Sequence, residues 1–528
     1  MKGQPSLLSI IAHARSGALD HAWWLFREAG FENVDDDPAV LSVRGRLLKD
    51  RALGASGAER RQFYLAAALA YARAAEIGGA NYPLINAATL SLLAGQREES
   101  RNLAGQVLAR ASLGTDEPET PYYRAATEAE AWLLLGELAR AQAAFDEAIA
   151  LAPLAFEDHA STLRQFALIL DETGSDKTWL DARRPPRCLH FAGHIALAAG
   201  DGAIEGEIRA LIKAERVGFG FGALAAGADI LIAEALLDVG AELHLVLPAA
   251  RNVFREYSVA RFGDGWSARF DAIVESAASV REFGRGGAPL SQPALQWAAE
   301  IAMGKTAMQA EVLMTEAFQL LIADGSESVA PLAGGSAWIG AAWERSGRRQ
   351  RVIAAQRSGP TDTCHAPMPE TPDRLAAMLR IDLSGADAAS LAGDILPKLA
   401  ATFAGRLCVP PRWTDEAVFA AFETVSEAAS AALAASAALS GGTPFRIAGH
   451  YSIATRVEDP FGGQPFLMGP PLALLDRIAR SAPSGAIHVT EDFAAALHAG
   501  SALARPRTEY IGEFPVRDEA VRLFSLKF

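Results

Sequence analysis

Apolar residues recur at helical spacing from residue 1 to about residue 183, and no alternating strand pattern interrupts them. Two blocks in this part resemble each other, at 63–111 and 122–153. From about residue 184 the pattern changes, because short apolar runs begin to alternate with helical segments. Strands that alternate with helices predict a parallel, doubly wound sheet. The chain therefore begins with an all-α region and continues as α/β.

The α/β region, residues 184–356, contains a helical segment at 203–216 and five runs typical of strands. These runs are RCLHFAGH (187–194), ELHLVLP (242–248), SVREF (279–283), AFQLLIADG (317–325) and GRRQRVIAA (347–355). Between the first two runs, GFGFGALAAGAD (218–229) predicts a Gly-rich loop that leads into a helix, and Gly240 ends that helix.

A linker separates the last part of the chain from the rest. The stretch QRSGPTDTCHAPMPETPD at 356–373 is rich in Pro, Thr and Ser and has few apolar residues, so it cannot pack a core. We place the linker at 357–371. Residues 372–528 then predict a strand, helices, a strand hairpin, a further strand or strand pair, a helix and a strand.

Composition limits the classes of function. At roughly 100–200 residues per domain, 528 residues predict about three domains. The net charge of −14 argues against a nucleic-acid-binding surface, which needs clustered Lys and Arg. The three Cys are scattered, which predicts neither a disulfide framework nor a structural zinc site. His190 and His194 share a strand face but lack a third ligand. No apolar stretch is long enough for a membrane span, so we expect a cytoplasmic protein.

The helical region carries a repeat signature in its second block. The small, aromatic and Leu-Gly positions of 122–153 resemble a tetratricopeptide repeat; they are Ala129, Trp132, Leu135, Gly136, Ala139, Ala143, Phe145, Ala148 and Pro153. The resemblance implies a helical-repeat domain over 1–183. Its concave surface would bind a protein partner. A helical shoulder that packs on the next domain explains the pattern equally well.

The middle region has glycines at the places where helices follow strands. Gly193 after the first strand, GALAAGAD at 222–229 and APLAGGSA at 330–337 resemble a SLOG-type, Rossmann-like nucleotide-binding domain. Helix N-termini near strand ends attract phosphates, so the resemblance implies a nucleotide-derived ligand. The candidate lining consists of Gly193, His194, Gly222, Gly227, Asp229, Gly334, Gly335 and Ser336. Alternatively, the glycines serve only tight turns in a scaffold without a ligand.

The third region contains five motifs in a characteristic order. They are LRIDLSGADAAS (379–390), RWTDEAVFAAFE (412–423), FRIAGHYSIAT (445–455), GPPLALLDRIA (469–479) and SGAIHVTEDFAAAL (484–497). Their order resembles the catalytic domain of class III adenylate and guanylate cyclases and covers 372–528. The resemblance implies an α+β, ferredoxin-like fold, a homodimer with its sites at the subunit interface, and a nucleoside triphosphate substrate.

The resemblance also implies residue roles. Asp382 and Asp415, which are 33 residues apart (415 minus 382), would hold Mg²⁺ or Mn²⁺, because hard cations prefer carboxylate oxygens. Arg477 would stabilise charge at the α-phosphate. Without a metal, Asp382 simply ends a strand and Asp415 caps a turn.

Three positions depart from the family pattern. Pro411, Phe466 and Ala473 stand where the family has polar groups that contact the purine and the ribose, and Thr414 replaces a Gly before the second Asp. Two readings remain. One is a signalling protein with a divergent cyclase domain whose base choice is altered or relaxed. The other is a catalytically degenerate cyclase-like domain for dimerisation, joined to a SLOG-like domain that senses a nucleotide-derived ligand. Hydrolysis or transfer of a nucleoside group by the SLOG-like domain is a third option.

Overall fold

The computed structural model describes residues 5–15, 18–113, 120–195, 197, 202–284, 289–324, 333–356, 371–383, 385–403, 407–414, 416–440, 444–460, 462–500, 506–516 and 519–527. The chain divides into two compact units. The first is Met1–Pro185 with Val312–Met314, and the second is Pro186–Glu311 with Thr315–Phe528. Asp415 and most of the expected linker lie outside the described residues.

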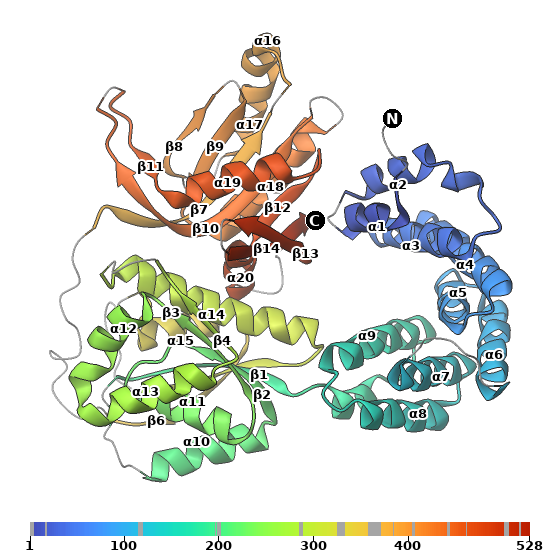
Figure 1. Ribbon diagram of the computed structural model, residues 1–528, viewed down its shortest axis with the longest axis horizontal. Helices are drawn as coiled ribbons and strands as arrows, with labels where there is room; N and C mark the ends of the chain where they lie inside the picture. Colours follow the sequence, from blue (N-terminus) through green and yellow to red (C-terminus); the bar gives the residue numbers. More distant parts are fainter. Residues whose placement is uncertain are drawn as a thin grey trace. The chain divides into compact units, whose positions relative to one another are not determined.

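The first unit is helical, as its apolar spacing predicts (Figure 1). Its helices are α1 (Leu7–Arg15), α2 (Leu19–Glu28), α3 (Pro38–Gly54), α4 (Gly57–Gly78), α5 (Asn81–Leu93), α6 (Arg97–Leu113), α7 (Pro121–Leu135), α8 (Leu138–Leu151) and α9 (Phe156–Thr173). Gly136 ends α7 with φ +85°, a left-handed conformation that favours glycine, and α8 begins two residues later. Small side chains such as Ala129 and Ala141 are fully buried, which lets neighbouring helices approach closely.

The second unit contains a six-stranded sheet in which all neighbours run parallel. Its strands are β1 (Arg187–Gly193), β2 (Val217–Gly222), β3 (Glu242–Leu247), β4 (Ser279–Glu282), β5 (Ala317–Ala323) and β6 (Arg349–Ala354). The strand order is β4-β3-β2-β1-β5-β6. The chain leaves β1 toward β2 on one side, and β5 arrives on the other side. This change of direction makes the β1–β5 pair the topological switch point of the sheet.

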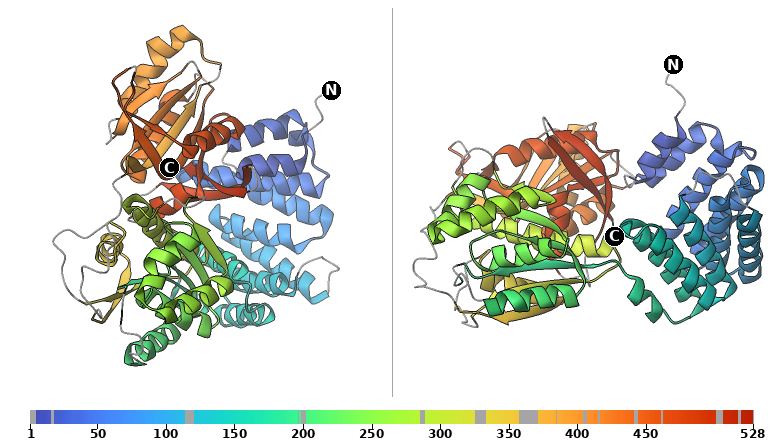
Figure 2. Two further views of the ribbon diagram at one scale, coloured as in Figure 1. Left: turned by 60° about the vertical axis from the view of Figure 1, so that its left-hand side comes forward. Right: turned by 60° about the horizontal axis from the view of Figure 1, so that its bottom comes forward.

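Helices cover both faces of the parallel sheet (Figure 2). They are α10 (Gly202–Ala214), α11 (Ala228–Asp238), α12 (Arg251–Ser258), α13 (Asp264–Ser276), α14 (Gln292–Val312) and α15 (Ser336–Arg345). Leu243, Leu245 and Leu247 of β3 share one core with α10 to α13. Val246, on the opposite face of the same strand, shares another core with α14. Successive residues of a strand point to opposite faces, so β3 has a hydrophobic layer on each side.

One local prediction is wrong. The segment GFGFG was expected to be a loop, but it forms most of β2. Its glycines are required by close packing rather than by a turn. A Cβ at Gly220 would lie 2.3 Å from the Leu236 side chain, and a Cβ at Gly222 would lie 2.6 Å from the Phe191 ring. Glycine inside a strand often marks such a close approach.

The second unit also contains an eight-stranded mixed sheet. Its strands are β7 (Asp373–Asp382), β8 (Leu407–Trp413), β9 (Ala417–Phe422), β10 (Arg446–Val457), β11 (Phe466–Met468), β12 (Ile487–Thr490), β13 (Arg507–Val516) and β14 (Glu519–Lys527). The order is β13-β14-β12-β10-β7-β9-β8, and β11 pairs with β10 outside this path. Among the described strands of this mixed sheet, only β10 and β12 pair in parallel.

Helices pack on both faces of the mixed sheet as well. They are α16 (Ala388–Ser390), a π-helical turn (Leu391–Ile395), α17 (Leu396–Thr402), α18 (Val425–Leu439), α19 (Pro470–Ser481) and α20 (Glu491–Ala499). Leu379 and Ile381 of β7 share a core with α17, α18 and α20. Met378, on the opposite face, shares a core with α19. The helical region, the parallel sheet and the mixed sheet agree with the predicted fold class at the level of element type.

No helix in the described ranges is long and apolar enough to cross a membrane.

Candidate functional site

The parallel sheet has a cavity at its switch point. The cavity has a volume of about 120 Å³ and lies at the C-terminal end of β1, beside the first turns of α11 and α15 and one side of α14. Five of the eight residues predicted to line a nucleotide site lie around it: Gly193, Asp229, Gly334, Gly335 and Ser336. Ligands of open α/β sheets bind at such strand ends. The cavity is therefore the candidate ligand site of this sheet.

Gly193 brings the end of β1 close to the start of α11. A Cβ at this position would lie 2.3 Å from the Ala228 Cβ and 3.0 Å from the Ile322 Cβ, so no larger residue fits without movement. Gly227 precedes α11 with φ +101°, a backbone conformation that favours glycine. These two glycines place the first turn of α11 against the cavity.

Asp229 supplies a buried carboxyl group in that first turn. Its Oδ2 accepts a hydrogen bond from the backbone N–H of Ala225 at 3.1 Å, and its Oδ1 has no hydrogen-bond partner among the described residues. Only 7% of the residue is exposed. Burial raises the pKa of Asp229 to about 7, because the ionised form loses its hydration, and the backbone N–H groups of Ala225 and Gly193 act in the opposite direction. A buried carboxyl oxygen without a partner can accept a hydrogen bond from a ligand hydroxyl or N–H.

The start of α15 supplies a second kind of group. Gly334 has φ +84°, and Gly335 is the N-cap of α15 and makes no side-chain capping bond. The first N–H groups of a helix have no partner inside the helix, and the helix dipole adds partial positive charge there. The N-terminus of α15, a helix of ten residues, is therefore suited to an anion such as a phosphate.

His194 contacts the first residue of α15. The backbone N–H of Asp324 donates to His194 Nε2 at 2.7 Å, and the Ser336 Oγ lies 3.3 Å from Nδ1. The Asp324 Oδ1 also lies 3.3 Å from Nε2, and the donor in the hydrogen bond between Nδ1 and the Ser336 hydroxyl depends on the tautomer of His194. His194 thus positions Ser336. Of the remaining predicted residues, Gly222 and Gly227 are also outside the cavity lining.

Sequence reasoning missed the apolar wall of the cavity, which α14 provides. Leu295, Ala298, Ala299 and Ala302 line this wall. Small residues on an amphipathic helix give no signal that distinguishes a cavity wall from a packed core, so the sequence contained no usable clue.

Asp382 is the last residue of β7, and it is only 2% exposed. Arg446 stands opposite it in the antiparallel β10–β7 register, and the Arg446 Nη1 lies 3.5 Å from the Asp382 Oδ1. This arginine partly compensates the buried carboxylate. Arg477 is an exposed residue of α19.

The structure describes only one of the two predicted metal ligands. Asp382 offers the oxygen donors that Mg²⁺ prefers, but its expected partner, Asp415, lies outside the described residues. Thr414, just before it, accepts hydrogen bonds from the N–H groups of Glu416 and Ala417 at 3.4 and 3.2 Å and so shapes the β8–β9 turn. Among described residues, no group of three or more His, Cys, Asp or Glu could hold a metal ion.

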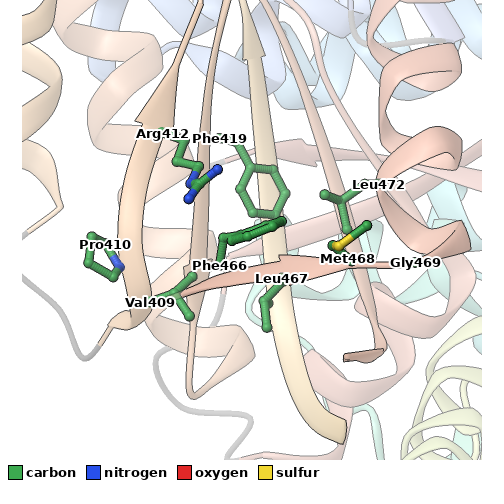
Figure 3. Close-up of a pocket in the computed structure, with 9 residues that line it drawn as sticks. All are labelled: Val409, Pro410, Arg412, Phe419, Phe466, Leu467, Met468, Gly469 and Leu472. Atoms are coloured by element: carbon green, nitrogen blue, oxygen red, sulfur yellow. The ribbon is translucent and has the colours of Figure 1, made fainter. Parts of the chain in front are cut away.

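A second pocket, about 310 Å³ in volume, lies where β8, β11 and the start of α19 meet (Figure 3). We call it the apolar slot. Its lining consists of Val409, Pro410, Arg412, Phe419, Phe466, Leu467, Met468, Gly469 and Leu472. It includes Phe466, at a position where the resemblance implies a polar base-contacting group, and it adjoins Pro411.

Among the described residues that line the apolar slot, Arg412 is the only charged one, and it already contacts two other residues. Its guanidinium carbon lies 4.0 Å from the Phe466 ring centre, and its Nη2 lies 2.8 Å from the Asp459 Oδ2. The slot can therefore stack against a flat ring, but its side chains offer few hydrogen bonds that distinguish one base from another.

Comparisons with known proteins show similarity for two parts of the chain. A family model described as "Tetratricopeptide Repeats-Sensor" matches residues 7–91. This match overlaps the first predicted repeat block but not the second. The search of curated proteins found no match.

Solved cyclase structures resemble about a third of the chain. The guanylate cyclase domain of RhGC from Catenaria anguillulae, in complex with GTP, has 10% identity and a TM-score of 0.25, over 29% of this chain and 97% of that chain. The adenylyl cyclase CyaB from P. aeruginosa has 13% identity and a TM-score of 0.25, over 30% and 97%. An adenylate/guanylate cyclase/hydrolase from Silicibacter pomeroyi has 18% identity and a TM-score of 0.24, over 30% and 98%. Likeness of this degree does not assign an activity.

Proposed function

We propose that the protein is a signalling protein whose parallel-sheet domain, residues 184–356, binds a nucleotide-derived ligand in the switch-point cavity. One observation carries this proposal: five predicted residues, distant in sequence, meet around one cavity that also holds a buried carboxyl oxygen without a partner. The cyclase-like domain, residues 372–528, is then the output domain, which acts through dimerisation. The helical region would recruit a protein partner.

The chemistry and the volume of the cavity limit which ligands fit it. The α15 N-terminus suits a phosphate, and Asp229 suits a hydroxyl group such as those of ribose. Sites for complete drug-sized ligands have volumes of roughly 300–1,000 Å³. The cavity has about 120 Å³ and therefore holds only part of a nucleotide, namely the sugar and phosphate. The base would extend out of the cavity.

Calorimetry with AMP and with adenosine tests this proposal. We expect AMP to bind and adenosine to bind at least tenfold more weakly, because only AMP carries the phosphate. Gly335→Asp should weaken AMP binding at least tenfold, since its carboxylate would compete for the same N–H groups while still capping the helix. Glu205→Gln is the matched control, because Glu205 is a first-turn carboxylate of α10. Equal binding by Gly335→Asp and the unmodified protein would refute the site.

A second candidate function is metal-dependent conversion of a nucleoside triphosphate to a cyclic nucleotide. It is favoured by the buried carboxylate of Asp382 at the end of β7. Asp382 and Asp415 would hold Mg²⁺ or Mn²⁺, which would make the ribose 3′-hydroxyl more acidic, and Arg477 would contact the phosphate. The apolar slot would hold the base with altered or relaxed selectivity.

An activity assay separates the two candidates. The protein is incubated with Mn²⁺ and each of ATP, GTP, CTP and UTP, and cyclic product is measured. Product that disappears in both Asp382→Asn and Asp415→Asn supports the cyclase. Its absence with all four triphosphates, in a protein shown to be dimeric, supports the non-catalytic output domain.

A further inference from the structure

Helix α14 contributes to two structures at once. Its residues Leu295, Ala298, Ala299 and Ala302 line the switch-point cavity. Its residues Trp297 and Ile301 lie in the hydrophobic core of the mixed sheet, together with Leu379, Ile381 and Phe493. Ala298 and Ala302 belong to both sets. A group that enters the cavity therefore contacts a helix that is also part of the core of the cyclase-like domain.

The backbone of α14 touches the backbone of α20 directly. A Cβ at Gly304 would lie 1.8 Å from the carbonyl oxygen of Ala495, so only glycine allows this approach. Helix α20 packs in turn on β10, β12 and β14. Because interiors are close-packed, α14 cannot shift along this contact unless α20 moves as well.

Ion pairs fix the first turn of α20 from three elements. Lys305 of α14 lies 3.3 Å from Glu491, and Arg522 of β14 lies 2.9 Å from the same carboxylate. Arg281 of β4 contacts Asp492 at 2.7 Å. Both carboxylates are largely buried, so loss of one partner would leave charge poorly compensated. The parallel sheet and the mixed sheet are thus held together at α20.

A partly buried hydrogen bond joins α14 to β10. The Tyr451 hydroxyl donates to Glu300 Oε2, and the Gln296 side-chain amide donates to Glu300 Oε1 at 2.9 Å. Burial raises the pKa of Glu300, and the hydrogen bonds from Tyr451 and Gln296 act in the opposite direction. These two hydrogen bonds also hold the Glu300 side chain in place.

The same chain of contacts reaches both candidate sites. A Cβ at Gly334 would lie 2.7 Å from the backbone nitrogen of Gln296, so the loop before α15 rests on α14 one turn before Glu300. At the other end, Tyr451 lies on β10, the strand that carries Arg446 beside Asp382. Contacts therefore run from Gly334 through Gln296, Glu300 and Tyr451 to the strand next to Asp382.

We infer that occupancy of the switch-point cavity is transmitted to the mixed sheet through α14, with the hydrogen bond between Glu300 and Tyr451 as the relay. This inference rests on the proposed function for the identity of the ligand, but not for the mechanical link. Glu300 and Tyr451 are positioning residues, because neither lies in the cavity lining.

The test fills the cavity with a larger side chain instead of a ligand. In the full chain, Ala299→Phe places a ring in the cavity from α14, and Ala299→Leu is a smaller version in case the first does not fold. Hydrogen exchange of the β10 and α20 amides is measured by mass spectrometry. We expect at least a fivefold change in exchange rates. Gln292→Phe, at the exposed first residue of the same helix, is the matched control and should give less than a twofold change.

The relay is tested in the same background. Tyr451→Phe removes only the hydroxyl and should reduce the response to Ala299→Phe to less than twofold. Glu300→Gln keeps an acceptor and should retain the response, whereas Glu300→Leu should abolish it. A purely structural role would change the baseline exchange rates but leave the response intact. Saturating AMP should reproduce the effect of Ala299→Phe.

The outcomes separate this inference from the proposed function. Unchanged exchange rates of the β10 and α20 amides in both Ala299 variants overturn the inference, even if AMP binds. A full response that persists in Tyr451→Phe overturns the relay. A transmitted response without AMP binding leaves the link standing and refutes the proposed ligand class.

Discussion

The two pockets of the second unit differ in what they offer a ligand. The switch-point cavity combines a helix N-terminus with a buried carboxyl group. The apolar slot is larger, at about 310 Å³ against about 120 Å³, but the only charged side chain among its described lining residues already contacts Phe466 and Asp459. Volume is therefore a poor guide to recognition here, because specificity depends on polar groups that lack a partner until the ligand binds.

The largest expected effect concerns the contact that joins the two regions. Gly304→Ala should lower the free energy of unfolding by about 3 kcal/mol, because the new methyl group meets the backbone carbonyl of Ala495. Thermal unfolding of the second unit is the measurement. Gly206→Ala, in an exposed part of α10 with nothing near its Cβ, should instead gain about 0.5–1 kcal/mol. A neutral Gly304→Ala would mean that the two sheets are not closely joined.

The next effect concerns Asp229 in the switch-point cavity. The folded-state pKa of Asp229 is about 7, above the ordinary value of 3.8, so the folded protein binds the extra proton between these values. Stability from this group is present below about pH 4 and is lost as pH rises through about 7. Asp229→Asn removes this loss and should therefore stabilise the protein more at pH 8 than at pH 4. Denaturant unfolding at both pH values checks the sign, and the opposite order would contradict a buried, protonatable carboxyl.

The smallest effect concerns the apolar slot. If the slot stacks a base without selecting it, ATP and GTP should compete with a fluorescent nucleotide at affinities within threefold of each other. Phe466→Ala should weaken both equally, by a factor that corresponds to about 1 kcal/mol, because it removes the stacking surface. Phe466→Leu keeps much of the apolar area and is the matched control. A tenfold preference for one purine would show that the slot reads the base through polar groups.

Local patterns in the sequence specify the order of the elements and much of their boundaries. Apolar periodicity and glycine stops predicted β1, β3 to β6 and the β8–β9 hairpin, and β7 ends at Asp382, where the apolar run meets its charge. These features are local, since each depends on residues close together in the chain. The glycines of β2 were misread, because a glycine selected for close packing looks the same in sequence as one selected for a turn.

Which distant residues meet depends instead on long-range packing. Gly193, Asp229 and Ser336 come together because β1 and β5 are neighbours at the switch point, and Gly222 is excluded because its position faces the Phe191 ring. The double role of α14 was equally invisible in the sequence. A helix that is apolar on most sides predicts burial, but it does not specify its neighbours. Which surfaces touch is fixed by long-range packing, and the amino-acid pattern of a single segment does not encode it.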